Sequence, residues 1–226
     1  WSSDVCSSDL FVVEAMDAAG SLDVASYRSR PEEDRSYGYG SVCVPGLAAG
    51  LWTAHQRWGA KPWAEDVAPA ISLARRGFEI LPKSRDFFEE QIKKLRRGDI
   101  ELARLYLPGG QLPAVGSLLP NEDLARTMER LAREGRDGFY RGPVAAAMVE
   151  ASRKGGGVLT LEDFARYEAR VVEPIQTTFR GRTIVCAPPP TGGAALFLPI
   201  MKVLESDPLT APLRSVANLD RIGRVW

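Results

Sequence analysis

The sequence is poor in the side chains that most enzymes use as bases or metal ligands. It contains one histidine, His55, and three cysteines among its 226 residues. The cysteines show no CxxC spacing and have no histidine beside them, so we expect no zinc site. The sequence also has no GxSxG, phosphate-loop or HExxH motif, which argues against the serine-hydrolase, nucleotide-binding and zinc-protease classes that carry them.

Excess charge and long apolar runs are missing as well. The chain carries 29 basic and 29 acidic residues, and this balance argues against binding to nucleic acid or to an anionic membrane. No apolar stretch reaches the roughly 20 residues that cross a bilayer. The composition, with 45% hydrophobic residues, is typical of a soluble globular protein. The widely separated cysteines are expected to be buried apolar residues rather than a disulfide.

Both ends of the sequence have unusual features. The first ten residues, WSSDVCSSDL, lack the basic and apolar regions of a signal peptide, and SDVCSSDL is also one translation of a common sequencing adapter. We therefore expect residues 1–10, Cys6 included, to be non-native and residues 11–226 to form the domain. The last residues predict an amphipathic helix, capped by Asn218, whose apolar face needs a partner. A truncated reading frame is the expectation.

The pattern along the chain predicts a mixed α/β (α+β) protein with a helix-rich middle. A short strand is expected at 11–16 and an exposed loop at 26–40. Helices are expected at 46–58, 63–76, 83–97, 121–134, 143–154 and 160–167. Asn121 is the expected cap of the fourth, and Thr160 to Asp163 have the form of a capping box at the start of the last. Residues 175–179 and 182–187 predict a β-hairpin that turns at Arg180–Gly181. A helix at 195–205 is apolar nearly all round, so it should be deeply buried.

Few side chains indicate chemistry by themselves. His55 lies in mid-helix, where a solvated or hydrogen-bonded role is expected rather than a charge relay. The acid pairs Glu32–Glu33 and Glu89–Glu90 are typical of solvated faces, and a glycosidase would need them across a cleft. The loop APPPTGG (187–193) is either a structural connector or the lining of a pocket at a helix N-terminus. Arg28, in a polar segment, has the geometry to hold a carboxylate with two hydrogen bonds.

Five segments of the sequence carry motifs in a fixed order. They are SVCVPGLAAGLWTAHQRWG (41–59), PAISLARRGFEI (69–80), DGFYRGPVAAAMVEA (137–151), GGVLTLEDFARYEARVVEPI (156–175) and RGRTIVCAPPPTGGAALFLPIMKVLE (180–205). In content and order they resemble the large-subunit region of the gamma-glutamyltransferase family, as an internal piece of its precursor.

The resemblance implies part of a four-layer αββα fold, that of the N-terminal-nucleophile hydrolases. In this family a precursor cuts itself and frees a threonine, which attacks a gamma-glutamyl amide with its own α-amine as general base. No cofactor or metal is implied. The threonine lies further along the family's chain, and Thr177–Thr178 belong to the predicted hairpin instead. These residues are therefore expected to be inactive alone and to need the downstream small-subunit region as a partner.

The resemblance also implies a substrate-binding arginine. The family holds the substrate α-carboxylate with the arginine of an aromatic-Arg-Glu-x-Ala-Pro loop, and Tyr27-Arg28 matches its first two positions. Arg28 is therefore the predicted substrate-binding residue, with Arg30 as second choice. Ser29 replaces the acid of the pattern, and Pro31 arrives one position early. The implied substrate is a small gamma-glutamyl compound such as glutathione.

Two other interpretations stay open. Relatives with this fold act on other amides, including beta-lactam side chains and oxamate, so an acylase is one alternative. A non-catalytic helical binding module is the other, and it predicts a self-sufficient fold. The family interpretation predicts exposed strand edges instead. The resemblance is compatible with a periplasmic or secreted protein as well as a cytoplasmic one.

Overall fold

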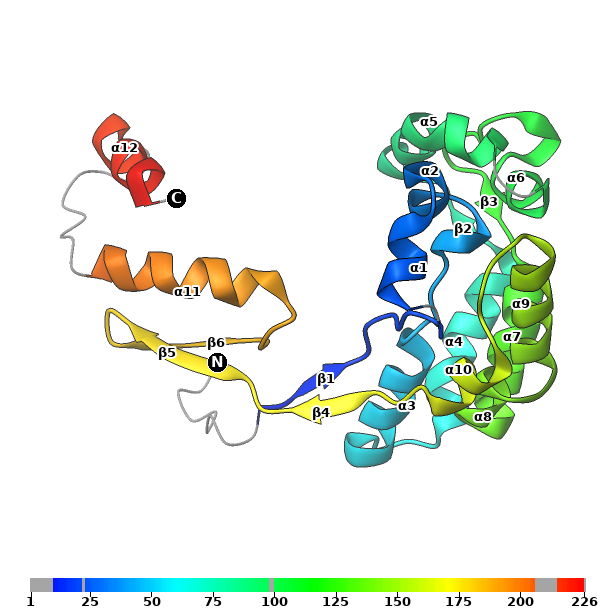
Figure 1. The fold of residues 1–226 in the computed structure, drawn as a ribbon, viewed down its shortest axis with the longest axis horizontal. Helices are drawn as coiled ribbons and strands as arrows, with labels where there is room; N and C mark the ends of the chain where they lie inside the picture. Colours follow the sequence, from blue (N-terminus) through cyan, green and yellow to red (C-terminus); the bar gives the residue numbers. More distant parts are fainter. Residues whose placement is uncertain (1–9, 22, 98–99, 206–214, 226) are drawn as a thin grey trace. The chain divides into compact units, whose positions relative to one another are not determined.

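The computed structural model describes residues 10–21, 23–97, 100–205 and 215–225, which belong to two compact units (Figure 1). Unit 1 combines Trp1–Glu14 with Arg170–Trp226, and unit 2 is Ala15–Ala169. The segment predicted to be non-native, residues 1–10, lies outside the described residues except for Leu10.

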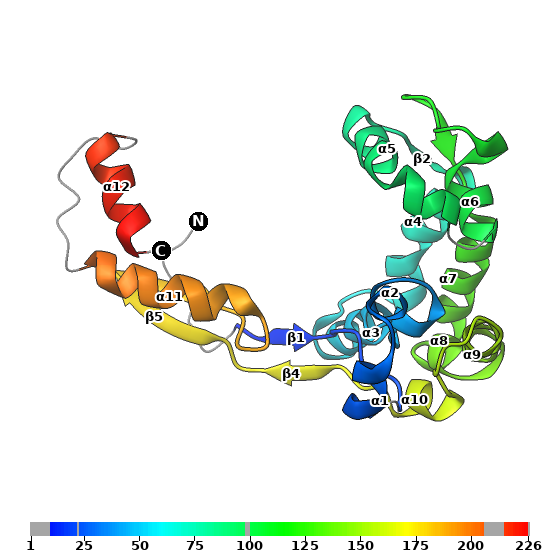
Figure 2. The ribbon, with the colours of Figure 1, turned by 45° about the horizontal axis from the view of Figure 1, so that its top comes forward.

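Unit 2 consists mainly of helices. In chain order they are α1 (Val24–Ser29), α2 (Glu32–Ser36), α3 (Leu47–Trp58), α4 (Trp63–Arg76), α5 (Pro82–Arg97), α6 (Ile100–Tyr106), α7 (Glu122–Glu134), α8 (Asp137–Tyr140), α9 (Gly142–Lys154) and α10 (Leu161–Arg166). Two short strands, β2 (Phe78–Glu79) and β3 (Leu118–Leu119), pair antiparallel. Figures 1 and 2 show α4 and α7 side by side, with α5 and α6 at one end of this pair.

The helix caps that the sequence predicts at Asn121 and Thr160 are in place. The Asn121 side chain accepts a hydrogen bond from the Leu124 N–H at 2.9 Å and starts α7. Thr160 and Asp163 form a capping box at α10, because each side chain accepts the backbone N–H of the other. Helix α4 continues through Pro69. The predicted long helices of the middle region are therefore confirmed.

The prediction that residues 26–40 form a loop is wrong, although most of these residues are exposed as expected. Helices α1 and α2 occupy most of it, separated by Arg30 and Pro31. The Asp23 carboxylate starts α1 by accepting the N–H groups of Ala25 and Ser26 at 2.9 and 3.0 Å. Both helices are short, and none of their side chains whose burial is described is buried, so no apolar periodicity indicates them.

The core of unit 2 lies between the start of α3 and helices α8 to α10. Its buried members are Val44, Ala49, Tyr140, Ala145, Leu159, Phe164 and Tyr167. The Tyr140 hydroxyl donates to the Pro45 carbonyl at 2.6 Å and accepts the Ala49 N–H at 3.1 Å. Burial raises the pKa of Tyr140 to about 12. Tyr140 therefore fixes the turn that leads into α3.

Tyr167 anchors the other side of this core. Its ring stacks on Tyr140, with centroids 5.4 Å apart and planes 6° from parallel. Its hydroxyl donates to the Met16 carbonyl at 2.7 Å. The start of unit 2 is thereby tied to residues that follow it by some 150 positions in sequence.

Unit 1 contains two antiparallel strand pairs and two helices. Strand β1 (Val12–Glu14) pairs with β4 (Arg170–Val172), and β5 (Ile175–Phe179) pairs with β6 (Arg182–Cys186). The second pair is the predicted hairpin, whose turn places Arg180 and Gly181 at φ 49° and 75°. Helices α11 (Gly192–Glu205) and α12 (Val216–Val225) complete the unit. The cap predicted at Asn218 is wrong, because Asn218 lies inside α12 and its N–H donates to the Ser215 Oγ at 3.3 Å, so Ser215 caps this helix instead.

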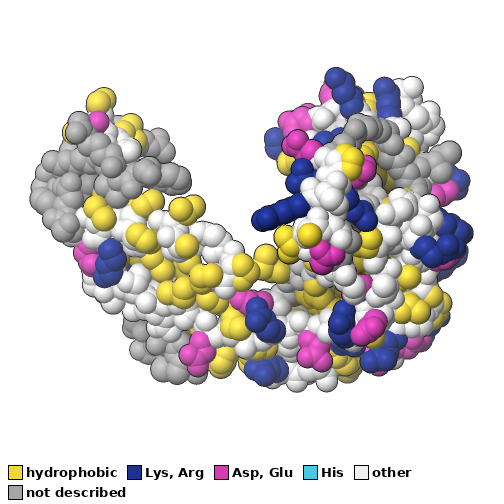
Figure 3. Space-filling view, in the orientation of Figure 1, with side chains coloured by type: hydrophobic (Ala, Val, Ile, Leu, Met, Phe, Trp, Pro, Cys, Tyr) yellow, Lys and Arg dark blue, Asp and Glu magenta, His cyan; other side chains and the backbone are white. Residues whose placement is uncertain are grey.

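The expected deep burial of the 195–205 helix is wrong for the described residues. Only Ala194 and Leu204 of α11 are buried, whereas Leu196 and Phe197 are 66% and 47% exposed. Figure 3 shows hydrophobic side chains gathered over α11. A two-stranded hairpin covers one side of a helix only, so the rest of its apolar surface faces outward.

Candidate functional site

The two predicted carboxylate-binding arginines lie at the C-terminal end of α1. Arg28 occupies the last turn and is exposed, while the N–H of Arg30 donates to the Tyr27 carbonyl at 3.3 Å. The Arg30 side chain lies against the chain at Gly40, where an added Cβ would stand 2.7 Å from its Nη1. Arg30 thus packs along the following turn, and Arg28 extends from the surface.

The aromatic residue next to Arg28 is held by α2. The Tyr27 hydroxyl donates to the Arg35 carbonyl at 3.4 Å, and the Arg35 guanidinium lies 6.0 Å from the centre of the Tyr27 ring. At the other end of α1, hydrogen bonds from Ser26 lower the pKa of the Asp23 carboxyl. An acid at the start of the helix and an arginine at its end both stabilise the helix dipole.

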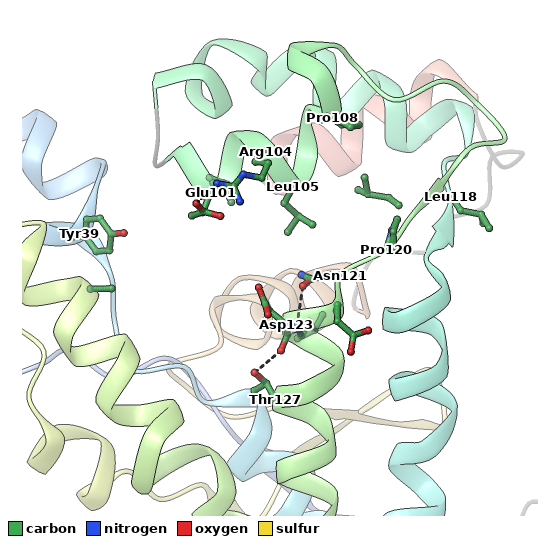
Figure 4. Close-up of a pocket in the computed structure, with 15 residues that line it drawn as sticks. Tyr39, Glu101, Arg104, Leu105, Pro108, Leu118, Pro120, Asn121, Asp123 and Thr127 are labelled. Carbon is green, nitrogen blue, oxygen red and sulfur yellow. Dashed lines mark hydrogen bonds and ion pairs between the residues drawn. The ribbon is translucent and has the colours of Figure 1, made fainter.

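A hollow of unit 2 lies between α6, β3 and the start of α7 (Figure 4). Its volume is about 920 Å³. Arg104 forms an ion pair with Glu101 at 2.8 Å on its rim. The Thr127 hydroxyl points to the Asp123 carbonyl and donates to it at 2.9 Å. Arg28 and Arg30 are not among the lining residues.

The residues that line this hollow provide no hydroxyl group with a neighbouring base, so they favour binding over catalysis. Its hydroxyl groups come from Tyr39 and Thr127, and the Thr127 proton is already used by a backbone carbonyl. A nucleophilic hydroxyl needs a neighbouring base that accepts its proton, and here the partner is a carbonyl instead. Hydrogen bonding to Arg75 also lowers the pKa of Glu122, so this carboxylate at the groove is held in its charged form.

Thr178 is a threonine with a lysine beside it, the pair that some hydrolases use as nucleophile and base. The Lys202 Nζ lies 2.7 Å from the Thr178 carbonyl and 3.4 Å from its Oγ1. The same ammonium donates to Glu205 at 2.8 Å, and this bond lowers the pKa of Glu205. Because the Lys202 amine donates to a carbonyl and a carboxylate, which can only accept, it is engaged as a hydrogen-bond donor and is not placed as a base for Thr178. The structure places Thr177–Thr178 in the hairpin, as predicted.

The other residues that the sequence analysis considered for chemistry make hydrogen bonds or ion pairs within the chain. His55 Nε2 lies 2.8 Å from the Lys61 carbonyl, so the expected hydrogen-bonded helix histidine is confirmed. Glu89 pairs with Arg85 at 3.2 Å on an exposed face of α5. In the loop 187–193, the Thr191 N–H donates to the Pro188 carbonyl at 3.2 Å, which forms the turn before α11.

The described parts of the chain contain neither a cluster of metal ligands nor a membrane-spanning helix. Among those residues, no three His, Cys, Asp or Glu side chains come together as a metal site would require. None of the helices in the same part of the chain has the length and apolar character to cross a membrane.

Comparison with known proteins gives consistent matches. The gamma-glutamyltranspeptidase family profile matches residues 13–222. A glutathione hydrolase proenzyme of Pseudomonas sp. (strain A14) is 34% identical over 172 residues, which cover 76% of this chain and 30% of the relative. The acylase ACY 1 proenzyme of Pseudomonas sp. (strain SE83) is 32% identical over 183 residues, 81% of this chain and 33% of the relative.

The fold comparison agrees with the sequence comparison. The crystal structure of Helicobacter pylori gamma-glutamyltranspeptidase superposes with a TM-score of 0.86 at 24% identity, covering 96% of this chain and 67% of that one. The fold is therefore that of the N-terminal-nucleophile hydrolases, of which this chain has a helix-rich part. The chain spans about a third of the length of the curated relatives that it matches.

Proposed function

The chain belongs to the gamma-glutamyltranspeptidase family, and on this premise we propose that the protein hydrolyses or transfers gamma-glutamyl amides such as glutathione. The observation that carries the proposal is the family match over residues 13–222, together with 34% identity to a glutathione hydrolase proenzyme. That relative is a proenzyme by name, which supports a precursor that is processed before it acts. An N-terminal threonine is the nucleophile of this chemistry, and its own α-amine is the base.

In this proposal Arg28 binds the α-carboxylate of the substrate. Its position in the last turn of α1 and its exposure leave the guanidinium accessible. A guanidinium binds a carboxylate through two parallel hydrogen bonds, which an ammonium does not reproduce. Arg30 packs against the Gly40 turn, so Arg28 is the better of the two candidates.

The test is a steady-state assay with gamma-glutamyl-4-nitroanilide on the product of the reading frame that contains these residues. Arg28→Lys should raise KM about tenfold and change kcat little, because it weakens a charged hydrogen bond to bound substrate. Arg30→Lys is the matched control and should leave KM unchanged. An unchanged KM in Arg28→Lys removes Arg28 from the site, and absence of gamma-glutamyl turnover in the wild type rejects the proposed substrate.

The 32% identity to an acylase proenzyme favours a second candidate, hydrolysis of another acyl amide on the same fold. A substrate without an α-carboxylate gains nothing from an arginine clamp. The acylase alternative therefore predicts turnover of a beta-lactam side-chain amide with the same KM in the wild type and in Arg28→Lys. The third interpretation, a non-catalytic helical module, is disfavoured because the family match extends through the hairpin and α11.

A further inference from the structure

Helix α1, which carries Arg28, forms without support from the core of unit 2. It has six residues, and none of them is buried. Isolated helices shorter than roughly 12 residues are marginally stable in water, because the first turn fixes several backbone angles for a single hydrogen bond. The direction of the Arg28 side chain therefore depends on the few polar contacts that keep this short helix formed.

The Asp23 carboxylate makes these contacts at the N-terminal end of α1. Its Oδ1 accepts the N–H groups of Ala25 and Ser26 at 2.9 and 3.0 Å, and its Oδ2 accepts the Ser26 hydroxyl at 2.5 Å. The Asp23 carbonyl also accepts the Tyr27 N–H at 3.0 Å. One residue thus satisfies N–H groups that the start of a helix otherwise leaves without a partner.

The contacts at the C-terminal end of α1 are weaker. The Tyr27 hydroxyl lies 3.4 Å from the Arg35 carbonyl, which is long for a hydrogen bond, and the Arg35 guanidinium lies 6.0 Å from the centre of the Tyr27 ring. The Ser29 hydroxyl donates to the Ser26 carbonyl at 2.8 Å inside the same helix. The three short hydrogen bonds of the Asp23 carboxylate are therefore the main contacts that keep α1 formed.

We propose that Asp23 is a positioning residue, which keeps α1 formed and thereby holds the Arg28 guanidinium where it binds the α-carboxylate of the substrate. Asp23 acts only through Arg28, so its role rests on the proposed function. A carboxylate repels the substrate carboxylate, and Asp23 therefore contributes through the fraction of molecules in which α1 is formed. The apparent affinity for the substrate falls in proportion to that fraction.

The experiment compares capping variants in the steady-state assay with gamma-glutamyl-4-nitroanilide, on the product of the reading frame that contains these residues. Asp23→Ala removes the cap and should raise KM about two- to fivefold. It should change kcat little, because saturating substrate selects the molecules in which α1 is formed. Asp23→Asn keeps an acceptor oxygen at the cap and should retain the wild-type KM, and Asp23→Gly should lie between the two.

Asp34→Ala is the matched control on the neighbouring helix α2. It removes the same side chain and the same charge, but the Asp34 carboxylate makes no hydrogen bond or ion pair with the described residues. KM should therefore stay at the wild-type value in Asp34→Ala. An increase as large as that in Asp23→Ala, or an increase in Asp23→Asn equal to that in Asp23→Ala, would assign the effect to lost charge and would overturn the proposal.

A double-mutant cycle separates positioning of Arg28 from a general loss of structure. In Arg28→Ala the guanidinium is absent, so the addition of Asp23→Ala should not raise KM further. If the two substitutions instead raise KM by factors that multiply, Asp23 acts on something other than Arg28 and the proposal is wrong.

Hydrogen–deuterium exchange measures α1 without an assay of activity. The amides of Ala25 and Ser26 should exchange faster in Asp23→Ala than in the wild type or in Asp23→Asn, while those of α4 and α7 should not change. If Asp23→Ala does not fold, Asp23→Gly and Asp23→Asn still give the order of KM values.

The outcome for Arg28 separates this role of Asp23 from the proposed function. If Arg28→Lys raises KM and Asp23→Ala changes neither KM nor exchange, the carboxylate site stands and the role of Asp23 is refuted. If Arg28→Lys leaves KM unchanged, the carboxylate site is rejected, and the role of Asp23 is rejected with it.

Discussion

Replacing Asp163 with asparagine is expected to destabilise unit 2 by about 2–3 kcal/mol near neutral pH. The Asp163 Oδ1 accepts the Ser21 hydroxyl at 2.5 Å and Arg166 Nη2 at 3.0 Å. Its Oδ2 accepts the N–H and the hydroxyl of Thr160, at 2.9 and 2.8 Å. Asparagine has one acceptor oxygen, so its NH₂ group would face two donors whichever way the amide is turned.

The pKa of Asp163 reflects the same hydrogen bonds and leads to a similar magnitude. Burial alone would raise it, but hydrogen bonds from Ser21 and Thr160 lower the pKa of Asp163 from 3.8 to about 2. A difference of nearly two pH units corresponds to about 2 kcal/mol. Because the folded-state pKa is the lower one, this stability is fully present above about pH 4 and is lost as the pH falls toward 2.

Urea unfolding followed by circular dichroism tests both the size of this destabilisation and its dependence on pH. The difference in unfolding free energy between wild type and Asp163→Asn should be largest at pH 6–7 and shrink steadily below about pH 4. Thr160→Ala removes the cap and should cost about 1 kcal/mol. A wild-type advantage of the same size at pH 3 and pH 7 would refute the electrostatic argument, and a difference below about 0.5 kcal/mol would refute the hydrogen-bond argument.

Two other variants test the packing of unit 2 by the same unfolding measurement. Tyr140→Phe should cost about 1–3 kcal/mol, because the Ala49 N–H loses its acceptor inside the core; a loss near zero would mean that water reaches that N–H. Gly135→Ala should be more damaging than Gly116→Ala. Both glycines have positive φ, which costs alanine about 1 kcal/mol or more. Gly135 also combines φ 60° with ψ −148°, a conformation that strongly favours glycine, and there the new Cβ would lie 2.7 Å from the Trp52 ring, whereas at Gly116 it meets nothing within 4 Å. Equal losses for the two glycines would show that the Trp52 ring moves aside.

The sequence predicts the elements whose signals are local. The Asn121 cap, the Thr160–Asp163 capping box and the hairpin turn at Arg180–Gly181 each depend on residues within a few positions of one another. Helix caps, capping boxes and two-residue turns can therefore be predicted from the sequence alone.

The sequence does not predict exposed helices without an apolar face, or burial and hydrogen bonds that depend on residues distant in sequence. Helix α1 has no buried residue, so its only local signal is the Asp23 cap. The burial expected for α11 depends on how much of its surface other segments cover, and composition does not contain that information. Asp163 illustrates both cases, since its bonds to Thr160 are predictable and its bond to Ser21, 142 positions away, is not.

The motifs that carry the family resemblance in unit 2 are mostly structural. Pro45 of the VPG motif presents its carbonyl to Tyr140 of the GFY motif, and Asp163 and Tyr167 of the LEDFARY motif bind Ser21 and the Met16 carbonyl. These hydrogen bonds fix the backbone on either side of α1. Such motifs can therefore be shared by glutathione hydrolases and acylases alike, as the similar identities to both indicate. We expect the choice of acyl group to depend instead on residues 27–31, where the sequence departs from the family pattern, and we propose Arg28 as the residue that discriminates between the two activities.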